Sequence, residues 1–220
     1  MSQSHNEHVT CPVCGHEQDF QAWEQIDVAD HPELKERLIS GELNCLVCSE
    51  CNAATDVLYP LVYRDPVSYL MIWMLPGENV PEDDAEPFGP LDETTAHLYQ
   101  FRLVRTINDL REKVLIAECG FDDRIMELFK ALIRHDAKSG IHPSDMMLFA
   151  GVEEENSASV AEFAVLRGPE QHGFSIPFEV LSKFSQEAEE KAKGVFKSAR
   201  RWQQVNQQTT ARGMVDSGIE

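Results

Sequence analysis

The first apolar pattern along the chain has the two-residue period of a β-strand. Its evenly spaced members are Phe20, Ala22, Ile26 and Val28. This period predicts a strand with one buried face. The period then lengthens to four residues at Leu34 and Leu38, which predicts a short helix over residues 31–40. We expect Asp30 to cap the start of this helix and Gly41 to end it.

Apolar runs in the middle of the chain predict more strands and a pair of helices. TDVLYPLVY and SYLMIWML have the composition of strands, and Pro60 places the first of them at a sheet edge or a bulge. HLYQFRLVRT also favours a strand. Thr106 and Asp109 have the spacing of a capping box and open a helix across INDLREKVLIAE. Asp122 caps a second helix, DRIMELFKALIRHDAKSG.

The last part of the chain predicts a small sheet followed by one long helix. MMLFAGV, SVAEFAVL and GFSIP are short strands separated by turn-forming residues. From Pro177 onward, apolar residues recur at steps of three and four: Leu181, Phe184, Ala188, Ala192, Val195, Ala199 and Trp202. This stripe predicts a helix that packs on the core and exposes a basic face to solvent. A helix that docks a partner is the alternative. After about residue 205 we expect a polar, mobile tail.

Composition separates these segments and restricts the class of partner. Residues 77–93 hold seven acidic residues, three prolines and no basic residue, which predicts a solvated linker or loop.

The whole chain carries 38 acidic and 19 basic residues, a formal net charge of −19. A field this negative disfavours binding to nucleic acid or to an anionic membrane. We therefore expect any partner to be a protein.

The N-terminal sequence and the apolar runs predict the compartment. MSQSHNEHVT lacks the basic segment and the apolar core of a secretory signal. No apolar run approaches the roughly 20 residues that span a bilayer. We therefore expect a cytoplasmic protein, in a reducing compartment where thiols persist. Its six cysteines are then expected to be metal ligands or reactive thiols rather than disulfides.

Two cysteine pairs share the spacing of a metal-binding turn. Cys11 and Cys14 form one C-x-x-C motif, and Cys48 and Cys51 form the other. Zinc takes four tetrahedral ligands with Zn–S distances of about 2.3 Å, and two such turns supply four sulfurs. The spacing predicts one structural Zn²⁺ ion held by these four thiolates. Because four thiolates leave no open position for water, a catalytic zinc ion is not expected.

Other interpretations of the cysteine pairs stay open. A redox C-x-x-C motif or an iron–sulfur cluster uses the same residue type. A catalytic zinc site would need His16 or His31 in place of one cysteine. Against the redox interpretation, the first pair is followed by Gly15 and a strand-like pattern, whereas a thioredoxin-like motif opens a helix.

Cys45 competes with Cys48 as a ligand, because CLVC has the same spacing as CSEC. Turn-forming residues surround Cys48, and Asn52 tolerates the left-handed conformation in which glycine would otherwise occur. Cys48 and Cys51 are therefore the expected ligands, and Cys45 is expected to be a small packed hydrophobe. Cys119 lies alone at a helix end and is expected to be a buried thiol.

The chain resembles the bacterial CpXC domain family in five stretches. These are CPVCG, LISGELN, CSECN, YPLVYRDP and REKVLIAECGFDDRIMELFK, and the similarity covers about residues 9–135. The resemblance implies that Cys11, Cys14, Cys48 and Cys51 are the ligands and that Cys45 is not. The second turn departs from the family pattern, with Ser49 and Asn52 where the family tends to have Pro and Gly. The resemblance implies no reaction.

These patterns predict an α+β protein. It has an N-terminal zinc ribbon with an inserted short helix, packed with mixed helices and short antiparallel strands, and a long C-terminal helix. Four parts are expected. They are the zinc-ribbon CpXC part at 1–76, an acidic linker or loop at 77–93, a helix pair with a small antiparallel sheet at 94–178, and an amphipathic helix with a polar tail at 179–220.

The favoured function is a zinc-binding protein whose structural zinc ribbon serves as a protein-interaction or scaffold module. No catalytic or cofactor-binding residue is predicted, because the sequence lacks nucleotide-binding and serine-hydrolase motifs. One alternative is an enzyme with a metal-dependent acidic site at Asp122, Asp123 and Glu127, although acids at these positions are also typical of a helix start. The other is a transcription- or nucleic-acid-linked module that uses the basic residues between 191 and 201.

Overall fold

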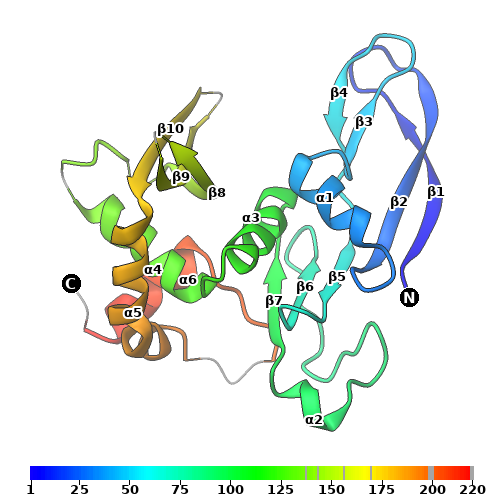
Figure 1. The fold of residues 1–220 in the computed structure, drawn as a ribbon. Coiled ribbons are helices and arrows are strands. Elements are labelled where there is room, and N and C mark those ends of the chain that lie inside the picture. The colour runs from blue at the N-terminus through cyan, green and yellow to red at the C-terminus, as the bar shows by residue number, and fades with distance from the viewer. Residues whose placement is uncertain (137, 143, 156, 169, 198–200, 219–220) are drawn as a thin grey trace. The chain divides into compact units, whose positions relative to one another are not determined.

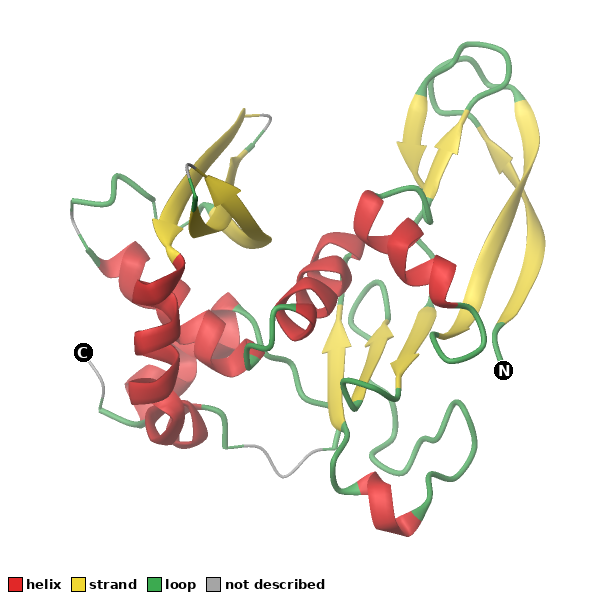
Figure 2. Ribbon diagram, viewed as in Figure 1, coloured by secondary structure: helices red, strands yellow, loops and turns green. Residues whose placement is uncertain are grey.

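The chain forms two compact units, Met1–Arg111 and Glu112–Glu220. The computed structural model describes residues 1–136, 138–142, 144–155, 157–168, 170–197 and 201–218. Both units contain helices and sheets (Figures 1 and 2), so the predicted α+β class is confirmed. The four-part division expected from the sequence remains a prediction. None of the helices in the described residues has both the length and the hydropathy that a bilayer crossing requires.

The first unit is built on a five-stranded sheet in the order β1-β2-β5-β6-β7. The strands are β1 Gln3–Thr10, β2 Glu17–Asp27, β5 Leu61–Asp65, β6 Leu70–Met74 and β7 Gln100–Val104. β1 and β2 form an antiparallel hairpin, whereas β2 pairs with β5, and β6 with β7, in parallel. Phe20, Ala22 and Ile26 of β2 are buried, as the two-residue period predicted.

The β1–β2 hairpin extends beyond the part of the sheet where β2 pairs with β5. Only the last three residues of β2, from Gln25 to Asp27, pair with β5. The far end of the hairpin is the turn at residues 11–16. A second antiparallel hairpin consists of β3 Cys45–Val47 and β4 Ala54–Asp56. Figure 1 shows the turns of both hairpins at the same end of the unit.

Pro60 divides the segment that was predicted as one strand. β4 ends at Asp56 and β5 begins at Leu61. Proline has no backbone N–H group, so it cannot donate to the hydrogen-bond ladder of a sheet. The prediction of one strand, at a sheet edge or a bulge, is therefore wrong, because the segment contributes to two strands and β5 lies in the middle of its sheet.

The predicted helix at 31–40 is confirmed, although its start differs from the expectation. α1 spans Pro32–Ser40, and Leu34 and Leu38 are buried. Gly41 ends the helix in the left-handed conformation, with φ of 86°. The N-cap position is occupied by His31, which makes no side-chain capping bond. Asp30 lies one residue too early to cap the helix.

The acidic segment after β6 connects β6 to β7 within the first unit, and α2 Glu93–Ala96 follows it. The side-chain amide of Gln25 donates to the carbonyl oxygen of Pro87 at 3.0 Å. The guanidinium carbon of Arg64 lies 4.8 Å from the centroid of the Phe88 ring. These contacts hold the segment against β2 and β5.

The second unit combines helices with an antiparallel sheet in the order β10-β9-β8. Its strands are β8 Met146–Glu155, β9 Ala158–Arg167 and β10 Glu170–Pro177, and its helices are α4 Asp123–His135, α5 Phe178–Val195 and α6 Gln207–Asp216. α3 Ile107–Glu118 crosses from the first unit into the second. The predicted capping box opens α3, since Thr106 Oγ1 accepts from the Asp109 N–H and Asp109 Oδ2 accepts from the Thr106 N–H.

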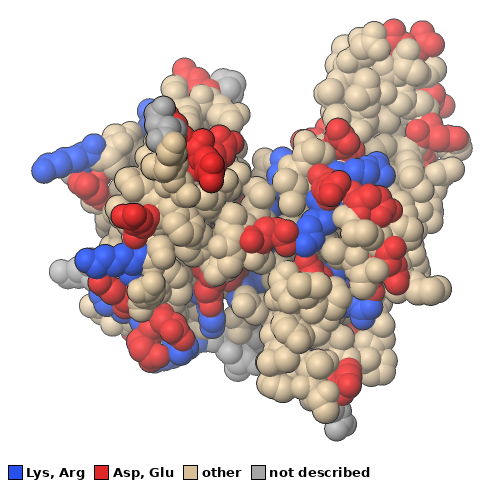
Figure 3. Space-filling view, viewed as in Figure 1, with Lys and Arg blue, Asp and Glu red and all other residues tan. Residues whose placement is uncertain are grey.

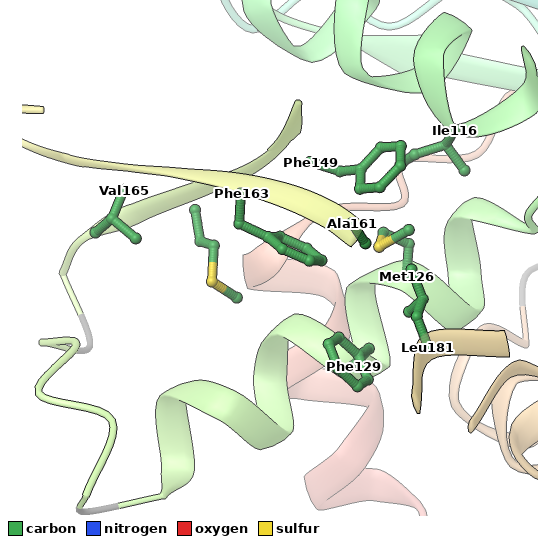
Figure 4. Close-up of a cluster of buried hydrophobic side chains, with 9 residues drawn as sticks. Ile116, Met126, Phe129, Phe149, Ala161, Phe163, Val165 and Leu181 are labelled. Carbon is green, nitrogen blue, oxygen red and sulfur yellow. The ribbon is translucent and has the colours of Figure 1, made fainter. Parts of the chain in front are cut away.

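The core of the second unit combines aliphatic side chains and methionines with three phenylalanines (Figure 4). Its buried members are Ile116, Met126, Phe129, Met147, Phe149, Ala161, Phe163, Val165 and Leu181. The Phe149 and Phe163 rings meet edge to face with centroids 5.6 Å apart. Phe129 of α4 lies 6.0 Å from the Phe163 ring. These contacts attach the sheet to α4.

The C-terminal region corrects two predictions. α5 ends at Val195, before the end of the predicted apolar stripe. Positions 199 and 200 lie outside the described residues, and Trp202 is buried beyond the end of α5. The segment expected to be a mobile tail forms α6 instead. Its start is fixed by a capping box between Asn206 and Thr209, a signal that the polar sequence contained and that the apolar pattern did not reveal.

Candidate metal centre

The turns of the two hairpins bring four cysteine sulfurs together. The Sγ atoms of Cys11, Cys14, Cys48 and Cys51 all lie within 4.8 Å of one another, and all four are free thiols. Cys11 Sγ lies 3.7 Å from Cys51 Sγ, and Cys14 Sγ lies 3.6 Å from Cys48 Sγ. A tetrahedral site with metal–sulfur bonds of about 2.3 Å has sulfur–sulfur edges of about 3.8 Å. The four sulfurs therefore fit around one metal ion.

The first turn is closed by two backbone hydrogen bonds. The Cys11 N–H donates to the His16 carbonyl oxygen at 2.8 Å, and the Gly15 N–H donates to the Cys11 carbonyl oxygen at 2.9 Å. Gly15 has a φ of 76°, in the left-handed region that a residue without a Cβ atom adopts most readily. This backbone returns the chain into β2 directly after the second cysteine.

The second turn repeats this geometry residue by residue. The Cys48 N–H donates to the Ala53 carbonyl oxygen at 2.9 Å, and the Asn52 N–H donates to the Cys48 carbonyl oxygen at 2.9 Å. Asn52 has a φ of 56°, so it occupies the left-handed position as predicted. The departure from the family pattern at Asn52 therefore leaves the shape of the turn unchanged.

The backbone of the first turn stabilises a thiolate at Cys11. The N–H groups of Cys14 and Val13 donate to Cys11 Sγ and lower the pKa of this thiol to about 6. At Cys14 the His16 N–H also favours the thiolate, but the neighbouring Cys51 sulfur, burial and the other two thiols together raise the pKa to about 12. One sulfur thus ionises readily while its neighbour resists a second negative charge. A bound cation supplies the charge that allows all four to ionise.

The four sulfurs differ in their exposure to solvent. Cys11 and Cys48 are buried, with exposed fractions of 2% and 1%, whereas Cys14 and Cys51 are exposed. The first cysteine of each turn therefore faces the interior between the hairpins, and the second faces solvent.

Gln18 connects the two hairpins and was not found from the sequence. Its side-chain nitrogen donates to the Val47 carbonyl oxygen at 3.1 Å, and its side-chain oxygen accepts from the Ser49 N–H at 2.9 Å. The sequence around Gln18 is polar and contains no motif that indicates this contact. The partners of the Gln18 amide come from the second hairpin, so the contact is visible only in the folded structure.

The competing residues lie outside the cluster. Cys45 belongs to β3, where it pairs with Asp56. His31 Nδ1 lies 2.8 Å from Glu33 Oε1 at the start of α1. Cys119 is half-buried, and burial raises the pKa of its thiol. In the part of the chain that the structure describes, the four cysteines are the one group of possible metal ligands with three or more members.

The three acids considered as an alternative site do not converge. Asp122 caps α4 through the Arg124 N–H at 2.8 Å and also accepts from the Arg124 guanidinium. Asp123 and Glu127 are buried, and their carboxylate oxygens lie 3.1 and 3.7 Å from Lys113 Nζ. These carboxylates are balanced by basic side chains of the protein itself.

Acidic residues precede the basic residues at the end of α5. Lys193 Nζ lies 2.8 Å from Glu189 Oε1 and 3.0 Å from Glu190 Oε1. The helix ends two residues after Lys193. The charge of Lys193 is therefore balanced by acidic neighbours, and α5 contains only the first part of the basic segment 191–201.

The family comparison agrees with the cysteine geometry. The family described as CpXC protein matches residues 9–130, more than half of the chain, and the match contains both cysteine turns. No curated protein and no solved structure matches. The cysteine cluster lies within the matched residues, which extend from the first unit into the second. This chain belongs to the CpXC family.

Proposed function

We propose that the four cysteines bind one structural Zn²⁺ ion, and that the two hairpins form a zinc ribbon that serves as a protein-interaction module. The observation that carries the metal assignment is the pair of sulfur–sulfur distances, 3.7 and 3.6 Å, close to the edge of a zinc–thiolate tetrahedron. Cys11, Cys14, Cys48 and Cys51 would be the ligands. Since such ligands require a reducing compartment, we expect the protein in the cytoplasm.

The role of the ion follows from the position of the hairpins. β2 pairs with β5 only from Gln25 to Asp27. Between the turn and Gln25, the β1–β2 hairpin therefore makes no backbone ladder with β5. Gln18 provides the polar contacts between this hairpin and the second one. Zinc, when bound, supplies a divalent charge and a crosslink between the turns. Residues 11–16 and 48–53 hold the sulfurs in place, and the closed thiolate set leaves no position for a substrate.

Metal analysis tests the zinc assignment. We expect one zinc ion per purified chain, and chelation should unfold the first unit, as measured by circular dichroism and hydrogen exchange. Cys48→Ser should abolish stoichiometric binding. Cys45→Ser is the matched control, because Cys45 lies outside the cluster, and it should retain the metal. The assignment is wrong if Cys48→Ser keeps one zinc ion per chain, or if the metal-free first unit remains folded.

The interaction surface is supported by exposed apolar side chains beside the ligands. Val13 lies inside the first turn and is 70% exposed, and Val47 directly precedes Cys48 and is 57% exposed. The face shown in Figure 3 carries Asp and Glu side chains on the hairpins around this end of the unit. A protein surface that combines apolar and basic side chains is the complementary partner.

Affinity capture with matched variants tests this surface. Val13→Ser together with Val47→Ser should remove a partner that the unmodified chain captures from its native cytoplasm. Val67→Ser is the control, because Val67 is 85% exposed and lies outside both turns. Retention of every captured protein by the double variant would count against this surface, while the zinc assignment would stand on its own test.

A further inference from the structure

Each sheet has two edges, and most of them carry features that prevent pairing with another strand. β8 ends in the three glutamates 153–155 and contains a register shift. β10 contains Gly173 and ends at Pro177. β7 has only five residues. Charged runs, irregularities, proline and short length are the usual protections of a sheet edge.

The edge strand β1 carries fewer of these protections, and its register shift lies at its first residues, between Gln3 and Ser4. It has eight residues, QSHNEHVT, with no proline, glycine, lysine or arginine. Seven of its eight side chains are exposed. Within the described residues, β2 is the one strand that pairs with β1. The outer edge of β1 therefore presents unpaired backbone N–H and C=O groups along its length.

The side chains of β1 include a histidine and a glutamate that can pair across a contact between two copies. His5 and Glu7 lie on the same face of the strand, with His5 Nε2 at 3.0 Å from Glu7 Oε1. An antiparallel pairing that centres on Asn6 places His5 of each copy opposite Glu7 of the other. A pairing centred on Glu7 would instead bring two carboxylates together, which is destabilising. Of these two registers, the side chains favour the one centred on Asn6.

We propose that the outer edge of β1 binds the same edge of a second copy of this chain. The two strands run antiparallel with Asn6 opposite Asn6, and the five-stranded sheets of the two copies join into one. This contact is isologous, so it closes at a dimer and does not propagate into a filament. Two His5–Glu7 pairs across the contact fix its register.

The oligomeric state of the full, metal-loaded chain tests the proposal. Sedimentation equilibrium should show a reversible monomer–dimer equilibrium in the micromolar range. His5→Glu replaces both cross-strand pairs with pairs of like charge, and it should weaken the dimer about tenfold or more. Combining His5→Glu with Glu7→His exchanges the two charges and should restore dimerisation. His97→Glu is the control, since it introduces the same change at an exposed side chain directly after α2.

Each outcome decides the proposal. A chain that stays monomeric up to millimolar concentration overturns it. A dimer that His5→Glu does not weaken uses another surface and also overturns it. Failure of the charge exchange to restore the dimer overturns the register. Circular dichroism of each variant shows whether the first unit is folded, and zinc content shows whether the metal centre is intact, so this test is separate from those of the proposed function.

Discussion

Gly15 and Asn52 hold equivalent positions in the two cysteine turns, one residue after the second cysteine of each pair. Both have positive φ angles, 76° and 56°. The motif C-x-x-C followed by a residue that tolerates this conformation is a local signal, so both turns could be predicted from the sequence. Gln18 could not be predicted, because its partners come from the other hairpin.

Gly15→Ala should weaken the metal centre through the backbone alone. No heavy atom lies within 4 Å of a Cβ atom added at Gly15, so the cost is that of the left-handed conformation, about 1–2 kcal/mol. We expect a zinc affinity about 5- to 30-fold lower, measured by competition with a chelator. Asn52→Gly makes the opposite change at the equivalent position and should leave the affinity equal or higher. Equal affinities in Gly15→Ala and the unmodified chain would contradict this explanation.

Asp145 provides a pH-dependent contribution to the stability of the second unit. The Arg167 guanidinium donates to its carboxylate and lowers its pKa to about 2, below the unfolded value of about 3.9. The contribution is present above pH of about 4 and is lost as the pH falls toward 2. Acid unfolding of Asp145→Asn should therefore lack this pH-dependent loss. Glu153→Gln removes an exposed acid from β8 and should retain it.

At the scale of elements, local capping signals predicted some helix boundaries and missed others. The Thr106–Asp109 capping box opens α3 as expected, whereas Asp30 is one residue from the cap of α1. α6 was missed because its sequence, QQTTARGMVD, is mostly polar. Its burial depends on packing, since Met214 belongs to a cluster with Ala188 and Ala192 of α5. Packing stabilises such a helix more than its own sequence does.

The contact between α5 and α6 requires a glycine on α6. A Cβ atom added at Gly213 would clash with the Val195 carbonyl oxygen. Gly213→Ala should therefore destabilise the second unit by about 1–3 kcal/mol in denaturant unfolding, despite the better helix propensity of alanine. Gly194→Ala is the matched control on α5, where an added Cβ meets nothing within 4 Å. It should be neutral or stabilise by up to about 1 kcal/mol.

At the scale of the whole molecule, the second unit contains a buried charge network that its sequence did not reveal. Lys130 Nζ lies 2.8 Å from Glu112 Oε1 and 2.6 Å from Glu127 Oε1, and all three side chains are buried. Glu112 Oε1 also accepts from the Phe149 N–H at 2.7 Å. The network therefore links α3, α4 and β8. Charged residues of a helix are expected on its solvent-exposed face. The burial of these three side chains therefore depends on how the neighbouring elements are arranged.

Removing the central cation of this network should be costly. Lys130→Met removes the cation nearest to the buried carboxylates of Glu112 and Glu127, and leaves Glu127 with the more distant Lys113. Loss of one partner of a buried ion pair costs about 3–5 kcal/mol. Urea unfolding of the second unit should show this loss. Lys193→Met removes an exposed lysine that also pairs with two glutamates, and its stability should be unchanged. Similar stabilities of the two variants would contradict the role of the network.

The sequence by itself determined the α+β class, the alternating faces of the strands, the start of α3 and the shape of the two cysteine turns. Each depends on residues within a few positions of one another. Only the tertiary structure decided that Cys11 and Cys51 lie 3.7 Å apart, that polar β1 is a strand, and that Lys130 is buried. These features depend on segments far apart in the sequence, because the partner that stabilises each one comes from another element.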